Sequence, residues 1–479
     1  MTAAENSADD RWFFGHPKGL LYLAFTEAWE RFSYYGMVAL LTLYMTKQLL
    51  LPGHMEHIAG IDLARRFFDE TYGGGRTLTV VALASAIWAF YSSTVYLTPL
   101  LGGFLADRLL GRTRTVVLGA CLMALGHFLM AFEVTFFLAL ICLVLGAGCL
   151  KGNLAAQVGG LYGPKDTRRA DAFQIYLIAI NTGVIFGPMV TGALGQGIAW
   201  HYGFGVAGIG MLLSLAIYLS GRRRLPPDPP LGAKARAAAA AERAPTTSRE
   251  WRIVVLLVLL LPVLALSVVG NNQIQNVYPV WADNNADLSV LGFRFLSSQL
   301  LSVDSFVSVV TMGLMVWFWR VWSRRLPEPD ELGKIIIGCI FSAIGVACLA
   351  LGQSLAMTAG HKVAFSWLLL FHVLNDIGFA NVFPVGLALY TRVAPRSMAG
   401  FMVAVYYLHL WLGNNLVGIL GGRLDKMDGA TFWMMHAILV GVAGVGFLVV
   451  KLLVGHWLRG EATEPDIATL VAADAGEMP

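Results

Sequence analysis

The composition of this chain separates it from soluble proteins. Of its 479 residues 57% are hydrophobic and only 13% are charged, and the mean hydropathy is +0.65. A soluble domain carries about 25% charged residues, so the composition excludes a soluble globule and indicates a membrane protein with many spans. We assign the net charge of +4 to basic loops between spans, not to nucleic-acid binding.

Twelve apolar stretches follow one another along the chain, each long enough for a membrane helix of about 20 residues. They lie at 20–50, 77–106, 115–132, 134–161, 171–193, 199–220, 252–282, 296–319, 333–356, 364–391, 396–421 and 431–456. We therefore predict an all-α membrane protein with 12 transmembrane helices.

A basic segment rich in Pro and Ala divides these stretches into two sets of six. We predict an N-terminal six-helix bundle over 1–220, a cytoplasmic linker over 221–251, a C-terminal six-helix bundle over 252–458 and a cytoplasmic tail over 459–479. A short surface helix is expected in the linker at Ala233–Arg243. Lys and Arg are concentrated in the loops that lie inside when both ends are cytoplasmic, which fixes the predicted orientation. We expect no cleavable signal peptide, because the first 18 residues are polar and the span after them is too long.

Three charges interrupt the first apolar stretch, in the sequence FTEAWERFSYYG. Glu27, Glu30 and Arg31 would each cost roughly 2.5–3.5 kcal/mol in the middle of a membrane helix. They must therefore face a polar cavity and have partners. Lys151, midway along the fourth stretch, is one predicted partner. Two acids and two bases around one cavity can exchange protons, although a purely structural ion-pair network is the alternative reading.

The loop after the second stretch reads GGFLADRLLGRTR. Gly102 and Gly103 would allow close helix contact, and Asp107 and Arg108 could pair at the cytoplasmic end. The string resembles the gating signature of the major facilitator superfamily. That resemblance implies two related six-helix bundles with a site between them.

A narrower resemblance comes from several motifs in order. EAWERFSYYG is similar to the E-x-x-E-R-F-x-Y-Y-G motif of the proton-dependent oligopeptide transporters, the POT family, and FQIYLIAINTG is similar to its span-five signature. CLKGNLAAQVG, FPVGLALYTRVAP and LGNNLVG also fit, so the likeness covers nearly the whole chain. It implies a monomeric, multi-pass symporter of the bacterial inner membrane that imports di- and tripeptides by alternating access. Protons would be the coupling ion, with no other cofactor, and the partners would be peptides and the lipid bilayer.

The resemblance also implies residue roles. Arg31 and Lys151 would attract the peptide's carboxylate, and Asn181 would bind near its amino end. Proton coupling would fall to Glu27, Glu30, Arg31 and Lys151, and the pocket would be lined by Tyr34, Tyr35 and Tyr96.

The chain departs from the family pattern at the outer gate. Val38 stands where relatives often carry an arginine, and Asn271 or Asn272 stands where its acidic partner is expected. Both members of that salt bridge are therefore absent together. The outer-side groups that could replace it are His54, Glu56, His57, Asp283 and Asp287.

A second departure concerns the amine-binding glutamate of span ten. Phe379 stands in its place, and Phe383 replaces a nearby serine. Asp304 is our first substitute, for both proton coupling and amine binding, and Asp376 is the second.

In span eleven, Tyr406 occupies the place of a common tryptophan and is expected to contact substrate. His409 is a further titratable candidate.

Three other functions are compatible with parts of the sequence. A proton-coupled carrier of nitrate or an organic anion is the nearest, because the amine-binding glutamate is missing. A drug exporter and a receptor or scaffold without transport fit the charge cluster less well. No nucleophile–base set or metal spacing indicates an enzyme, and the five cysteines are interpreted as small apolar fillers.

Overall fold

The structure is a computed structural model that describes residues 14–163, 166–228, 248–290, 292–394 and 398–458. The predicted surface helix at Ala233–Arg243, most of the predicted linker and the tail at 459–479 lie outside the described residues. We call the side that carries residues 50–79 the outer side, following the predicted orientation.

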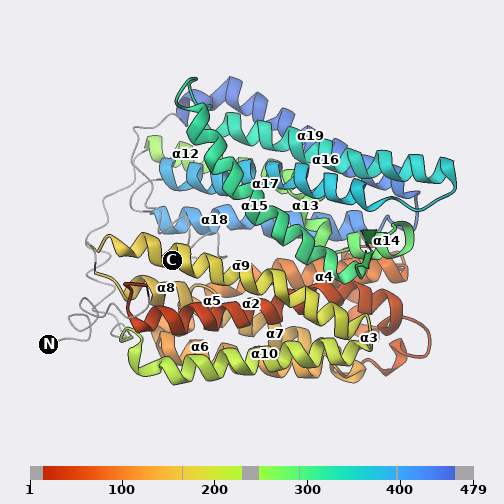
Figure 1. Ribbon diagram of the computed structural model, residues 1–479, viewed down its shortest axis with the longest axis horizontal. Helices are drawn as coiled ribbons and strands as arrows, with labels where there is room; N and C mark the ends of the chain where they lie inside the picture. The colour runs from red at the N-terminus through yellow and green to blue at the C-terminus, as the bar shows by residue number, and fades with distance from the viewer. Residues whose placement is uncertain (1–13, 164–165, 229–247, 291, 395–397, 459–479) are drawn as a thin grey trace.

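The helices form two groups that lie side by side, one drawn in red to yellow-green and the other in green to blue (Figure 1). The first group contains α2 (Lys18–Tyr44), η1 (Met45–Leu49), α3 (Ile61–Thr71), α4 (Val80–Val95), α5 (Thr98–Leu105), η3 (Ala106–Leu110), α6 (Arg112–Leu129), α7 (Phe136–Leu150), α8 (Asn153–Gly160), α9 (Arg168–Gly195) and α10 (Trp200–Gly221). The second contains α12 (Ser248–Ser267), α13 (Val269–Asn272), η6 (Gln273–Gln275), α14 (Tyr278–Asn285), η7 (Ser297–Gln299), α15 (Leu300–Trp322), α16 (Glu331–Ala359), α17 (Phe365–Val393), α18 (Ala399–Gly421) and α19 (Gly429–Val454). The groups meet where α4 packs on α18 and α9 packs on α15.

Within the described residues, nine helices are long and apolar enough to cross a membrane. Trp251–Ser267 and Val269–Gln275, bent by 48°, form a tenth span if taken together. The other two predicted spans are also helical. They are α2, which carries the three internal charges, and α6, which begins with Arg112 and Arg114. Helices therefore occupy all the predicted positions, while the count of 12 membrane spans stays a prediction.

Glycines set the closest helix contacts of the first group. A Cβ on Gly102 would lie 1.9 Å from the carbonyl oxygen of Gly148, so α5 and α7 can touch only because the side chain is absent. A Cβ on Gly183 would lie 2.2 Å from the carbonyl oxygen of Ala28, which brings α9 against the charged turn of α2. Gly103, in contrast, faces open space, so the prediction that it permits close packing is wrong.

Two small elements on the outer side were not predicted. Helix α3 follows the first span, and a hairpin of β1 (Ser289–Val290) and β2 (Phe293–Arg294) precedes α15. The hairpin turns at Gly292, whose φ of +82° favours glycine. Both elements lie in loops, where short apolar runs give little pattern for prediction.

Candidate functional site

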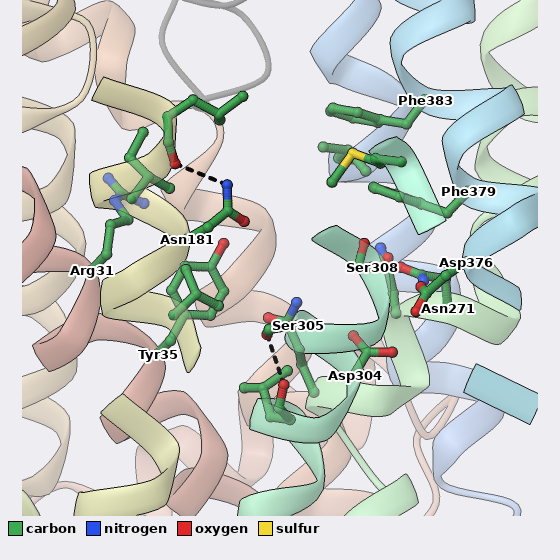
Figure 2. Close-up of a pocket in the computed structure, with 18 of the residues that line it drawn as sticks. Arg31, Tyr35, Asn181, Asn271, Asp304, Ser305, Ser308, Asp376, Phe379 and Phe383 are labelled. Atoms are coloured by element: carbon green, nitrogen blue, oxygen red, sulfur yellow. Dashed lines mark hydrogen bonds between the residues drawn. The ribbon is translucent and has the colours of Figure 1, made fainter. Parts of the chain in front are cut away.

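A cavity of about 200 Å³ lies between the two helix groups and is lined by both (Figure 2). Its polar lining comes from Arg31, Tyr35, Tyr96, Lys151, Asn181, Asn271, Asn272, Gln275, Asp304, Ser305, Ser308, Asp376 and Tyr407. In Figure 2, Arg31, Tyr35 and Asn181 lie on one side of the open space, and Asp304 and Asp376 lie on the other. The cavity thus has one wall from each group.

An ion cluster forms part of the first wall. Arg31 Nε lies 2.6 Å from Glu27 Oε1 and 2.7 Å from Glu30 Oε2, and each residue is at most 3% exposed. Glu27 and Arg31, four residues apart, are in contact across one helical turn, so these buried charges do have partners, as expected. Close approach of α9 at Gly183 also brings in Tyr176, whose hydroxyl donates to Glu27 Oε2 at 2.8 Å.

The two carboxylates of this cluster differ in their partners. Glu27 accepts hydrogen bonds on both oxygens, from Arg31 and Tyr176. Glu30 contacts Arg31, but neither of its oxygens accepts a well-aligned hydrogen bond from the described residues. Hydrogen bonds to an anion stabilise its charged form. Glu27 receives such bonds from two donors, so its anion is stabilised more than that of Glu30.

Lys151 lies where the fourth span breaks. Helix α7 ends at Leu150, and Gly152 adopts a φ of +83° before α8 begins. The break directs Lys151 Nζ to 5.2 Å from the ring centre of Tyr34 and 5.3 Å from that of Tyr96, both within cation–π distance. Tyr34 also lies near Arg31, whose Cζ is 5.8 Å from the ring centre. Tyr34 does not line the cavity itself, whereas Tyr96 does.

Two carboxylates belong to the opposite wall. Asp304 Oδ1 lies 2.8 Å from Nδ1 of His372, a fully buried residue that the sequence had not singled out. The Nε2 atom of His372 lies 3.0 Å from the hydroxyl of Tyr278. Asp376, one helical turn after His372, is 2% exposed, and its Oδ2 accepts no hydrogen bond within the described residues.

Aromatic rings cover the inner end of the second wall. Phe379 and Phe383 stack with ring centres 5.1 Å apart and an interplanar angle of 9°. Both line the cavity, together with Tyr407, which stacks on Tyr96 at 6.3 Å.

Two predicted residues of α18 lie behind this wall. Tyr406 is fully buried and donates its hydroxyl proton to the carbonyl oxygen of Phe383 at 2.7 Å. His409 is fully buried and bonds through Nδ1 to the carbonyl oxygen of Tyr406. Neither residue lines the described cavity, and the next residue in the chain, Tyr407, takes the lining position. Sequence reasoning missed Tyr407 because the rotation of α18 decides which tyrosine faces inward.

The predicted outer-gate residues have different partners. His54 and His57 approach the two carboxylate oxygens of Glu133 at 2.7 and 3.7 Å, within the first helix group. Glu56 caps the backbone of Gly53, and Asp287 accepts from the backbone N–H of Ser289. These contacts are local.

Asp283 bridges the two groups instead. Its Oδ2 lies 3.0 Å from Lys47 Nζ, and Lys47 also donates to the Oδ1 of Asn284 at 2.9 Å. Gln196 of the first group donates to Asp283 and Ser297 at 3.0 and 2.9 Å. No sequence pattern indicates a role for Lys47, because a lysine at the end of a span is usually solvated.

Further hydrogen bonds join α4 to α18 above the cavity. Ser85 donates to the carbonyl oxygen of Gly418 at 2.9 Å, and Asn415 donates to Ser93 at the same distance. Together with the Lys47–Asp283 pair they join the two helix groups on the outer side.

On the inner side a second pocket involves both groups. Asp107, Arg112 and Lys151 line it from the first group, and Phe401 lines it from the second. Lys151 therefore lies on the central cavity and on this inner pocket. Arg108 lies over the ring of Phe104 at 4.8 Å, and no ion pair joins Asp107 and Arg108 in the part of the chain that the structure describes.

Two helix groups, a charged cavity between them and contacts that join them on the outer side define a membrane transporter of the major facilitator type, not an enzyme. The chain belongs to the POT family, whose sequence profile matches residues 113–242 and 232–434.

Individual relatives agree with this assignment. A di-/tripeptide transporter of Lactococcus lactis subsp. lactis is 29% identical, with 92% of this chain and 96% of the relative covered. An uncharacterized transporter of Bacillus subtilis is 27% identical over 95% of this chain and 97% of its own length. A crystal structure of a POT peptide transporter in complex with sulfate superposes with a TM-score of 0.80 at 25% identity, covering 96% of this chain and all of that one.

Proposed function

We propose that the protein is a proton-coupled symporter that imports di- and tripeptides by alternating access between its two helix bundles. Both ends of the chain lie in the cytoplasm, and the protein resides in the bacterial inner membrane as a monomer. Protons are the coupling ion, and transport uses no other cofactor.

The observation that carries this proposal is the opposite sign of the charged side chains that line the two cavity walls. Arg31 and Lys151 line the first wall, with Glu27 and Glu30 paired to Arg31 outside the lining, and Asp304 and Asp376 line the second. A peptide is a zwitterion, with a carboxylate at one end and an ammonium at the other. The two charged ends of the peptide match these walls when the peptide backbone spans the cavity. Asn181 can then bond to polar groups of the peptide.

Glu30 is the group we assign to proton uptake. A peptide carboxylate that reaches Arg31 competes with Glu30 for the same guanidinium. Because Glu30 has no other hydrogen-bond donor in the described residues, it then gains most from taking a proton. Glu27, which bonds to Arg31 and Tyr176, keeps Arg31 in position.

The membrane potential supplies free energy to the coupled entry of peptide and proton. A zwitterion that enters with one proton moves one positive charge, for which 100 mV supplies about 2.3 kcal/mol. That free energy supports roughly fiftyfold accumulation of peptide before any pH difference is added. We assign this arrangement, in which Lys47 and Asp283 join the groups on the outer side, to the stage that releases peptide inward.

The main alternative is a carrier of nitrate or a small organic anion on the same fold. Arg31 and Lys151 would serve such a solute equally well. Asp304 and Asp376 would oppose it, because like charges in one cavity repel each other. The acidic second wall therefore favours the peptide.

Uptake into proteoliposomes tests the proposal. Purified protein is reconstituted and offered labelled dialanine with an imposed inward proton gradient or with none, and labelled nitrate is offered in parallel. We expect gradient-driven accumulation of dialanine and none of nitrate. Folded protein that accumulates nitrate but no dialanine would support the anion carrier instead.

A further inference from the structure

A chain of three hydrogen-bonding groups runs from the cavity into the second helix group. Asp304 of α15 lines the cavity with a side chain 14% exposed, and its Oδ1 bonds to Nδ1 of His372 on α17. The opposite ring nitrogen of His372 bonds to the hydroxyl of Tyr278 on α14 at 3.0 Å. Asp304, at one end of this hydrogen-bonded series, lines the cavity, and Tyr278, at the other end, is fully buried.

This arrangement accommodates two protonation states without losing a hydrogen bond. With a neutral imidazole, Nδ1–H donates to Asp304 and the hydroxyl of Tyr278 donates to Nε2. With one more proton on Nε2, the imidazolium donates to Asp304 on one side and to the oxygen of Tyr278 on the other. The added proton neutralises the pair of Asp304 and His372, and the carboxylate then attracts an outside cation less strongly.

The surroundings of His372 make Asp304 its main charged partner. On its own helix, Asp376 lies one turn away and also lines the cavity. The rings of Tyr278 and Phe371 pack on the imidazole, with centres 5.5 and 5.0 Å away.

Two polar groups on α19 and α16 already have hydrogen-bond partners. From α19, His436 lies beside Trp433 and bonds to Gln273 and the carbonyl oxygen of Phe432. From α16, Gln353 accepts a hydrogen bond from Trp281.

We propose that Asp304, His372 and Tyr278 form a second proton-binding site, at which a proton on His372 competes with the peptide's amino group for Asp304. His372 acts as a positioning residue: it touches no substrate and sets the charge and orientation of the carboxylate that does. The inference rests on the proposed peptide transport and adds a proton site on the wall opposite Glu30.

The two sites respond oppositely to acid. A proton on Glu30 frees Arg31 for the peptide's carboxylate and favours binding. A proton on His372 weakens the attraction of Asp304 for the ammonium and disfavours binding. A peptide whose amino end is acetylated lacks the ammonium and responds to the first site alone, so comparing free and acetylated peptides isolates the second site.

The test measures the dissociation constants of dialanine and N-acetyl-dialanine for purified protein between pH 5.5 and 7.5. In the wild type, the preference for dialanine should fall about fivefold as the pH drops from 7.5 to 5.5. In His372→Gln the preference should stay constant across that range, because glutamine bonds to Asp304 but takes no proton. A wild-type preference that does not change with pH, or a pH profile that His372→Gln leaves intact, would overturn the inference.

A second variant covers the case in which His372→Gln does not fold. Tyr278→Phe keeps the imidazole and removes only the group that receives its Nε2 proton. The preference should then change less with pH than in the wild type, and a profile identical to the wild type would count against the site. Monodisperse elution and thermal unfolding establish that each variant is folded. Folded wild type that binds neither peptide would contradict the proposed function itself, whereas binding of both with a constant preference contradicts this inference alone.

Discussion

Lys47 Nζ lies 3.0 Å from Asp283 Oδ2, and this ion pair joins the two helix groups on the outer side of the cavity. Neither residue occupies the positions at which relatives often carry their outer salt bridge. Those positions hold Val38, which is 1% exposed, and Asn271 or Asn272. Asn272 donates to Asn414 at 2.7 Å within its own group. We interpret the Lys47–Asp283 pair, whose side chains are both about one third exposed, as the substitute for that salt bridge.

Breaking this pair should weaken the contact between the two helix groups on the outer side. A partly exposed ion pair contributes at most about 1 kcal/mol, so Lys47→Met or Asp283→Asn should shift the balance of conformations toward the outward-open form by up to about fivefold. Distances between spin labels on the outer ends of α9 and α15 measure that balance. Asp287→Asn is the matched control, because the Asp287 carboxylate accepts from the backbone N–H of Ser289 in its own helix group, and it should leave the distances unchanged. The exchanged double variant, Lys47→Asp with Asp283→Lys, should recover part of the closed population. Equal effects of Asp283→Asn and Asp287→Asn would contradict the interpretation that the Lys47–Asp283 pair holds the outer side closed.

The unequal partners of the two buried glutamates predict different mutant behaviour. Glu30→Gln should abolish gradient-driven accumulation of dialanine while exchange between equal internal and external pools stays within about twofold of wild type. Glu27→Gln should impair both, because it removes the group that orients Arg31. Counterflow and accumulation assays on the same preparation separate these outcomes. Intact accumulation in Glu30→Gln would assign the proton to another group.

Phe379 and Phe383 should favour peptides with aromatic side chains. A stacked aromatic pair contributes about 0.5–1.5 kcal/mol beyond burial. Phe379→Ala should therefore weaken inhibition of dialanine uptake by phenylalanyl-alanine about two- to tenfold, with dialanine itself affected less. Leu369→Ala on the same helix, at a position 41% exposed, is the control. An equal loss for both peptides would argue against a side-chain pocket at this place.

Asp166 gives a prediction about stability outside the membrane. Hydrogen bonds from Arg168 hold the pKa of this carboxyl below its usual value of 3.8. A depressed pKa stabilises the folded state above that value, and the contribution is lost as the pH falls through the folded-state pKa. Asp166→Asn should cost up to about 1 kcal/mol at pH 7, and the difference from wild type should shrink below pH 3.8. Thermal unfolding against pH measures it, with exposed Asp62→Asn as the control. A difference that persists at the acidic end would mean that the charge is not the cause.

Helix positions could be predicted well because long apolar runs leave few other structures possible. The fifth predicted span, 171–193, corresponds to α9 at Arg168–Gly195. That the charges of the first span would have partners could also be predicted, since unpaired charges inside a membrane span are costly. The contacts of Arg31 with Glu27 and Glu30 agree with that argument.

Contacts between distant segments could not be predicted in this way. Lys47 and Asp283 are far apart in the sequence, and each resembles a solvated loop charge when read alone. In the sequence, His372 is one residue of an apolar helix with no evident partner. In the structure, its Nδ1 atom lies 2.8 Å from Oδ1 of Asp304 on α15. Tyr407 replaced Tyr406 in the cavity lining because the rotation of α18 depends on its neighbours. Sequence periodicity indicates where helices run, while docking of the two groups decides which side chains meet.

Proton movement driven by peptide tests the central claim most directly. Proteoliposomes that hold a pH-sensitive dye receive external dialanine with no gradient imposed. The account predicts that the interior becomes acidic when dialanine is added, that nitrate has no such effect, and that Glu30→Gln abolishes the signal. Entry of labelled dialanine into wild-type vesicles without any acidification would contradict proton-coupled peptide transport.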